Sequence, residues 1–288
     1  MEITTIGVVG AGAMGTGIAQ AAAQYGFRVK VFDECAAAKD KSLATIKQLT
    51  AAAVEKGKQT AEGREELLNR LDYVAELANL ADCQLVIEAV IEVLEVKKAL
   101  FKQLDALLEQ DAIIASNTSS MSITTLAAAT RRADKVAGMH FFNPAQVMKL
   151  VEVIRGFHTS DGTVQTLRSL CGQMGKVSIE VKRDTPGFVV NRLLLPQLRE
   201  AARILEEGVA SIEDIDTAMK LGLNHPMGPF ALSDLTGIDV VYYVLEYFHR
   251  EMGEQYAPPL LLKQLVQAGY LGRKSGHGWY DYSQPQES

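Results

Sequence analysis

The chain has 288 residues, of which 48% are hydrophobic and 22% charged, as is typical of a globular protein with enough apolar side chains for a sizeable core. A formal net charge of −6 without an evident basic face argues against a protein that acts on nucleic acid, and no run of about eighteen uncharged apolar residues predicts a membrane span. Three widely spaced cysteines and a start without the basic stretch of a signal peptide indicate no disulfide framework and no zinc-ligand pattern, and they favour a reducing, cytoplasmic setting without a bound metal.

The first part of the chain alternates short apolar runs with helical stretches. Helical periodicity follows the first apolar run and covers 36–56, 95–109 and 161–174. Such alternation predicts an α/β fold with a mainly parallel sheet and helices on both faces. The apolar runs, each of which predicts a buried strand, cover 6–9, 28–32, 85–89, 112–115, 136–139, 150–154 and 177–181.

The pattern changes at residues 183–187, a turn-forming cluster in which Pro186 cannot continue a strand. We therefore expect one α/β domain over residues 1–184 and a smaller, all-helical domain over residues 187–288. The helical stretches of the second domain cover 188–208, 212–220, 238–252 and 258–268.

A glycine-rich run, Gly10-Ala11-Gly12-Ala13-Met14-Gly15, follows the first strand and opens the first helix. This context is typical of the Rossmann dinucleotide-binding turn, in which the helix N-terminus faces a pyrophosphate. Asp33, at the end of the second strand, would accept hydrogen bonds from the hydroxyl groups of an adenosine ribose and would repel a 2′-phosphate. NAD is therefore favoured over NADP. The alternative is an ordinary glycine turn with an unrelated surface aspartate.

A histidine and a glutamate stand in neighbouring apolar runs near the middle of the chain. Glu152 lies among apolar side chains, where a carboxylate is costly to bury without a partner, and His140 ends the preceding run. A carboxylate that holds one ring nitrogen orients the imidazole, so that the other nitrogen can take a proton from an alcohol. The alternative is a core histidine with Glu152 exposed on an edge strand.

A cluster of hydroxyl and amide side chains, residues 116–120, follows another strand. In an open α/β sheet, ligands bind at the carboxyl ends of the strands, so Ser119 could hold a substrate oxygen. The alternative is a helix N-cap, and both roles can coexist. Asn191, in the first turn after Pro186 and Gly187, is a candidate for the same oxygen.

These segments together resemble the 3-hydroxyacyl-CoA dehydrogenase family in its single-function, short-chain form, from about residue 4 to residue 282. The resemblance implies a helical hairpin insertion near residues 36–70 of the NAD-binding domain, and a helical second domain that binds substrate and forms a homodimer. The stretches that carry it are 88–92 with Lys97, 116–120, 140–144, 148–152, 186–192, 219–222, 225–229 and 272–276.

By resemblance, His140 is the general base, Glu152 orients it, and Ser119 and Asn191 bind the reacting substrate oxygen. The family's cofactor-binding positions carry over as two groups, one for each half of NAD. The adenosine diphosphate half falls to Gly10, Gly12, Ala13, Met14, Gly15 and Asp33. The nicotinamide-ribose half falls to Ala89, Glu92, Lys97, Asn117, Ser119, Asn143 and Lys274.

The expected contact with coenzyme A is a lysine on the helical hairpin, and Lys56 is the candidate beside Lys47 and Lys58. A solvated helix face would explain these lysines equally well. Three positions depart from the family pattern, and they bear on phosphate binding, on loop stiffness and on the shape of the acyl pocket. These positions are Ala52 in place of a further lysine, Gln146 in place of a proline, and Trp279 in place of a smaller residue.

The resemblance thus implies reversible, NAD-dependent oxidation of an L-3-hydroxyacyl-CoA, with 3-hydroxybutyryl-CoA or a close relative such as 3-hydroxyadipyl-CoA as substrate. Fatty-acid oxidation, butanoate formation and aromatic-acid breakdown all remain open as its pathway. One alternative is a dehydrogenase of a free hydroxy acid, as in the lambda-crystallin branch. Another is a non-catalytic NAD-binding or structural protein.

Overall fold

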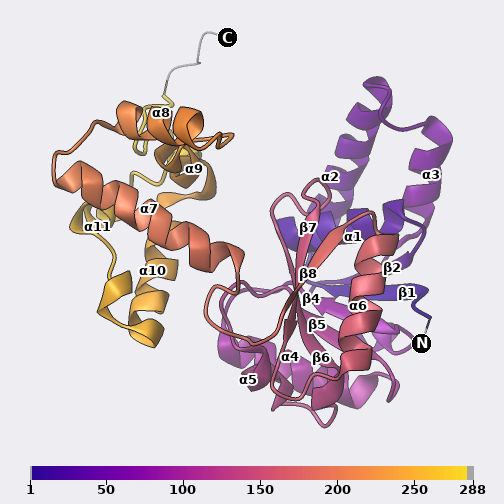
Figure 1. The fold of residues 1–288 in the computed structure, drawn as a ribbon. Coiled ribbons are helices and arrows are strands. Elements are labelled where there is room, and N and C mark those ends of the chain that lie inside the picture. Colours follow the sequence, from indigo (N-terminus) through magenta and orange to yellow (C-terminus); the bar gives the residue numbers. More distant parts are fainter. Residues whose placement is uncertain (1, 284–288) are drawn as a thin grey trace. The chain divides into compact units, whose positions relative to one another are not determined.

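The computed structural model describes residues 2–283, which divide into two compact units between Phe188 and Val189: unit 1 precedes this point and unit 2 follows it (Figure 1). Unit 1 contains all the strands of one sheet, with helices against it, and unit 2 contains helices. The predicted fold class, a Rossmann-type sheet followed by a smaller helical domain, is confirmed. Among the described residues, no helix is long and apolar enough to cross a membrane.

The sheet of unit 1 has eight strands within the described residues, in the order β3-β2-β1-β4-β5-β6-β7-β8. Neighbouring strands run parallel except for β6 and β7, which are antiparallel. The strands are β1 (Thr5–Val9), β2 (Arg28–Phe32), β3 (Leu71–Tyr73), β4 (Leu85–Glu88), β5 (Ile113–Ser116), β6 (Val136–Phe141), β7 (Leu150–Arg155) and β8 (Val177–Val181).

The central strands are mostly apolar because helices cover both faces of the sheet. Successive side chains of one strand therefore enter different cores: Ile87 joins one hydrophobic cluster and its neighbour Val86 joins the other. Helices α1 and α6 contribute to the first cluster, and α4 and α5 to the second. The helices of unit 1 are α1 (Ala13–Gln24), α2 (Ala36–Glu55), α3 (Ala61–Asn69), α4 (Leu94–Leu107), α5 (Ile123–Ala127) and α6 (Asp161–Gln173), with short 3₁₀ turns at Leu77–Leu80 and Ala133–Lys135.

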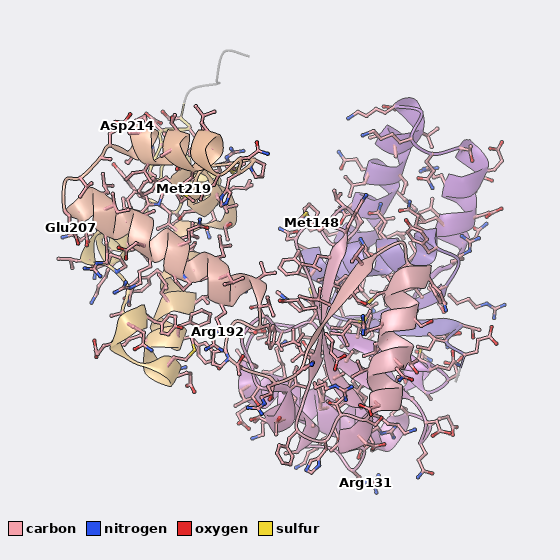
Figure 2. The ribbon with its side chains drawn as sticks, in the orientation of Figure 1. Arg131, Met148, Arg192, Glu207, Asp214 and Met219 are labelled. Carbon is pink, nitrogen blue, oxygen red and sulfur yellow. The ribbon has the colours of Figure 1, made fainter. Side chains whose placement is uncertain are left out.

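Unit 2 packs its helices around a core of its own, in which Leu198, Leu245 and Phe248 are buried. Figure 2 shows Arg192 near the start of its longest helix and Glu207 just past the end. The helices are α7 (Val190–Glu206), α8 (Ile212–Gly222), α9 (Pro229–Thr236), α10 (Ile238–Met252) and α11 (Leu260–Gln267), with 3₁₀ turns at Glu254–Tyr256 and Arg273–Ser275.

Two elements were not predicted from the sequence. Strand β3 has three residues, too few to show an alternating pattern, and it is recognised only by its pairing with β2. Helix α9 has eight residues and begins at Pro229 after the N-cap Gly228, so it offers only about two turns of periodicity.

Candidate active site

The glycine-rich turn joins β1 to α1, and the structure gives Gly10 and Gly15 separate steric reasons to be glycine. Gly10 has a φ of +105°, and a Cβ there would lie 2.5 Å from the carbonyl oxygen of Ala89. A Cβ on Gly15 would lie 1.8 Å from the carbonyl oxygen of Gly10, so only glycine lets α1 pack this closely. A Cβ on Gly12 would meet no atom within 4 Å, which leaves open space where a ligand could approach the backbone.

The carboxylate of Asp33 holds this turn from the end of β2. Its Oδ2 accepts a hydrogen bond from the N–H of Ala11 at 2.7 Å, and its Oδ1 accepts one from the N–H of Cys35 at 2.8 Å. A carboxylate offers roughly four acceptor sites, so about two remain for a pair of ribose hydroxyls. Helix α1 has no side-chain cap at Gly12, which leaves its first N–H groups for a phosphate. This turn and carboxylate fit the adenosine diphosphate half of NAD.

His140 and Glu152 stand opposite each other on the antiparallel pair β6 and β7. The His140 Nδ1 lies 2.7 Å from the Glu152 Oε2, the glutamate is fully buried, and the histidine is 6% exposed. The alternative of an exposed Glu152 is therefore wrong. A buried carboxylate at this distance selects the tautomer with the proton on Nδ1, so the unprotonated Nε2 can serve a substrate.

Two aromatic rings pack against the imidazole. The ring centroids of Phe142 and Phe188 lie 4.7 Å and 5.7 Å from that of His140, and both rings are tilted to it. Phe188 is buried although its φ is +50°, an unfavourable backbone conformation for a bulky residue. The two rings and Glu152 together limit the orientations that the histidine can adopt.

The hydroxyl cluster after β5 is built into the same edge of the sheet. Asn117 Oδ1 accepts a hydrogen bond from the N–H of Phe141 at 2.9 Å, which ties the end of β5 to β6 next to His140. Ser119 follows and is half-buried. The N-cap of α5 is Ser122, whose Oγ accepts a hydrogen bond from the N–H of Thr125, so capping does not explain residues 116–120.

A second buried carboxylate, Glu88, ends strand β4. Lys97 Nζ lies 2.5 Å from Glu88 Oε1 and 3.2 Å from Glu92 Oε2. Burial works against ionisation of Glu92, but the Lys97 ammonium and the hydroxyls of Thr118 and Ser120 outweigh it and hold the pKa of Glu92 below its usual range. Glu88 was assigned no role from the sequence, although it stands within the apolar run 85–89 as Glu152 stands within the run 150–154.

A pocket of about 460 Å³ lies beside the glycine-rich turn. Asn143 lines it, and so does Gln146, whose Oε1 lies 2.6 Å from the position that a Cβ on Gly17 would take. The polar side chains that α1 and α2 contribute were not predicted, because nothing in their spacing distinguishes them from a solvated helix face. They are Thr16, Lys41, Ser42 and Thr45.

The remaining candidate residues belong to the end of α2 and to unit 2. Lys56 is exposed at the C-terminal end of α2. Asn191 lies in the first turn of α7, in unit 2. Lys274 also belongs to unit 2, where its Nζ pairs with Asp239 at 2.6 Å. Trp279 packs in the core of unit 2, with its ring 4.6 Å from that of Phe230.

Comparison with known proteins identifies both parts of the chain. A family model described as "3-hydroxyacyl-CoA dehydrogenase, NAD binding domain" matches residues 5–185, and one described as "3-hydroxyacyl-CoA dehydrogenase, C-terminal domain" matches residues 187–282. A probable 3-hydroxybutyryl-CoA dehydrogenase of Bacillus subtilis is 47% identical over 285 residues, which are 99% of each chain. A 3-hydroxybutyryl-CoA dehydrogenase of Clostridioides difficile is 46% identical, over 96% of this chain and 99% of that protein.

A solved structure agrees with these matches. The crystal structure of (S)-3-hydroxybutyryl-CoA dehydrogenase from Ralstonia eutropha superposes with a TM-score of 0.95 at 47% identity. The match covers 98% of this chain and all of the other.

Proposed function

The chain belongs to the 3-hydroxyacyl-CoA dehydrogenase family of NAD-dependent enzymes, and from that premise we propose that it interconverts L-3-hydroxybutyryl-CoA and acetoacetyl-CoA. The observation that carries the proposal is the buried contact of 2.7 Å between His140 Nδ1 and Glu152 Oε2. A non-catalytic NAD-binding protein would gain nothing from burying a carboxylate against a histidine at the ligand-binding edge of its sheet.

His140 acts as the general base in this proposal. Glu152 accepts the Nδ1–H hydrogen bond and stabilises the imidazolium that forms when Nε2 takes the proton of the substrate's 3-hydroxyl. NAD, when bound, supplies the acceptor for the hydride that leaves C3, the carbon that carries this hydroxyl. In the reverse direction the imidazolium returns the proton to the oxygen, so the same pair serves both directions.

Ser119 and Asn191 are proposed to bind the reacting oxygen, Ser119 through its hydroxyl and Asn191 through its side-chain amide. Ser119 follows β5 at the carboxyl edge of the sheet, which is where ligands of open α/β sheets bind. The cofactor contacts proposed for Glu92, Lys97, Asn117 and Asn143 have the same support, because these residues follow β4, β5 and β6 at that edge.

Three further proposals concern the partners and setting of the enzyme. Lys56, exposed at the end of α2, contacts the coenzyme A phosphates. Unit 2 forms a homodimer, because it carries strongly exposed leucines such as Leu193 and Leu221, which are 73% and 82% exposed. The enzyme works in the cytoplasm, where its free thiols stay reduced.

The decisive experiment follows NADH absorbance with purified protein and acetoacetyl-CoA, with free acetoacetate and NADPH in parallel. We expect fast loss of NADH with the thioester alone. Activity on the free acid instead would move the protein to the hydroxy-acid dehydrogenases and would withdraw Lys56 as a coenzyme A contact.

A further inference from the structure

The buried carboxylate of Glu88 has no part in the proton transfer proposed above. It ends strand β4 and is completely inaccessible to solvent, and both of its carboxylate oxygens accept hydrogen bonds from protein groups. A carboxylate in this position must be compensated, because an isolated buried charge is strongly destabilising. The compensation comes from groups on three different elements.

Each carboxylate oxygen of Glu88 has a distinct set of donors. Oε1 accepts hydrogen bonds from Lys97 Nζ at 2.5 Å and from the N–H of Val90 at 2.8 Å. Oε2 accepts one from Ser116 Oγ at 2.6 Å. Glu88 therefore cross-links the end of β4, the loop that follows it, the end of β5 and the first turns of α4.

Lys97 is held by this arrangement far more tightly than a lysine usually is. Its side chain is 1% exposed, although its stem of four methylene groups is flexible. Its ammonium lies between the carboxylates of the buried Glu88 and the partly exposed Glu92. Glu92 in turn accepts hydrogen bonds from the hydroxyls of Thr118 and Ser120, on either side of Ser119. A displacement of Lys97 would thus reach Glu92 and the loop that carries Ser119.

We propose that Glu88 is a positioning residue for the cofactor, which fixes Lys97 so that the Lys97 ammonium and the Glu92 carboxylate face the nicotinamide-ribose half of NAD in one arrangement. This inference rests on the proposed function, because it assumes that NAD binds at this edge. It assigns to Glu88 an effect on one half of the cofactor only. Asp33, which serves the other half, accepts its hydrogen bonds from the N–H groups of Ala11 and Cys35, whereas the donors to Glu88 are Lys97, Val90 and Ser116.

The test compares two ligands that share the adenosine diphosphate half. The variant Glu88→Gln keeps an acceptor oxygen but loses the charge that holds Lys97. We expect the Kd for NADH, measured by fluorescence titration, to rise by about tenfold, a typical effect of uncoupling two groups in contact. The Kd for ADP, measured by calorimetry, should stay within about twofold, since ADP lacks the nicotinamide and its ribose.

A matched control and a double-mutant cycle separate positioning from general damage. Glu95→Gln removes the same charge from α4, where Glu95 is exposed and pairs with Lys98, and it should leave both affinities unchanged. In a Lys97→Met background, the further change Glu88→Gln should have almost no effect on NADH binding, because Glu88 acts through Lys97. If Glu88→Gln weakens ADP and NADH equally, or weakens NADH equally with and without Lys97, the positioning role is wrong.

NADH binding by the wild-type protein distinguishes failure of the proposed function from failure of this inference. Failure of the wild type to bind NADH would refute the proposed function, whereas normal NADH binding by Glu88→Gln would refute only this inference. If Glu88→Gln does not fold, Ser116→Ala takes its place. It changes no charge and removes the hydrogen bond that Ser116 donates to Glu88, together with the one that Ser116 accepts from the N–H of Thr118. Ser116→Ala should raise the Kd for NADH severalfold and leave the Kd for ADP unchanged. If the Kd for NADH is the same in this variant as in the wild type, the positioning role is wrong.

Discussion

At the scale of single residues, the molecule places buried carboxylates where a cation or a proton donor meets them. Glu152 is opposite His140, and Glu88 receives Lys97 and Ser116. Each carboxylate is costly to bury, and each is compensated by a partner that it orients in return. The functional side chains at the edge of the sheet are therefore held in place by neighbours that do not react.

The first prediction concerns the general base. His140→Gln keeps a polar side chain of similar size but cannot take a proton, so kcat should fall by about 10²–10⁴-fold, the usual contribution of general acid–base catalysis. The Kd for NADH should change little, because the glycine-rich turn and Asp33 are untouched. Steady-state kinetics and fluorescence titration measure the two effects, and equal losses in both would contradict the assignment.

The second prediction concerns cofactor choice. Asp33→Asn keeps an oxygen for the N–H of Ala11 but removes the charge that would repel a 2′-phosphate. We expect the preference for NADH over NADPH, expressed as the ratio of kcat/KM values, to narrow by about tenfold or more. An unchanged ratio would mean that Asp33 holds the turn without meeting the ribose.

At the scale of elements, pairing of strands and capping of helices decide where side chains go. The antiparallel register of β6 and β7 brings His140 and Glu152 together although twelve residues separate them. Helix α4 ends against the guanidinium of Arg132, which donates hydrogen bonds to the carbonyl oxygens of Asp105, Leu108 and Glu109. Arg132 is itself paired with the Asp105 carboxylate at 2.8 Å, so a buried ion pair stabilises the end of this helix.

The third prediction follows from this ion pair. Asp105→Asn leaves the Arg132 charge buried without its partner, so the free energy of unfolding at pH 7 should fall by about 3 kcal/mol. Asp111→Asn is the matched control, since Asp111 is exposed and pairs with Lys135 at the surface; it should cause no measurable change. Urea denaturation of the three proteins measures both differences.

The pH dependence of the same difference has a defined sign. Burial works against ionisation of Asp105, but the hydrogen bonds from Arg132 and Arg131 outweigh it and hold the pKa of Asp105 below its usual range. A carboxyl whose pKa is lowered on folding contributes stability above its unfolded pKa of about 3.9, and this contribution is lost as the pH falls further. The difference in the free energy of unfolding between wild type and Asp105→Asn should therefore decrease below about pH 4. A difference that increased there would contradict the ion-pair account.

At the scale of the whole molecule, each of the two units has its own hydrophobic core. Unit 1 carries the cofactor turn and the His140–Glu152 pair, whereas Asn191 and Lys274 belong to unit 2. Unit 2 also carries exposed leucines, for which we propose a second copy of the chain as the partner.

The fourth prediction is the mass of the protein in solution. Light scattering after size-exclusion chromatography should give about twice the chain mass of 31.3 kDa at micromolar concentration, because exposed apolar surface of this kind is typical of an interface. A mass equal to one chain, unchanged up to high concentration, would refute the homodimer.

Much of the fold could be predicted from local patterns. Each of the seven apolar runs lies mostly within a strand, because a sheet covered by helices on both faces buries most side chains of its strands. Strand β3 and helix α9 were missed, since three and eight residues carry too little periodicity to stand out. The antiparallel direction of β7 could not be predicted either, because the apolar pattern of a run does not depend on the direction of the strand.

By itself, the sequence determined the fold class and the glycine-rich turn with Asp33, because each depends on the local cost of a backbone conformation or on the pattern of apolar residues. Whether Glu152 is buried against His140 or exposed was decided by the antiparallel register of β6 and β7. Only the tertiary structure decided that Lys97 lies between Glu88 and Glu92, that Ser122 caps α5, and that Phe142 and Phe188 pack against His140. These contacts depend on strand order, register and helix position, which are set by the packing of the whole unit and leave no periodic signal in the sequence.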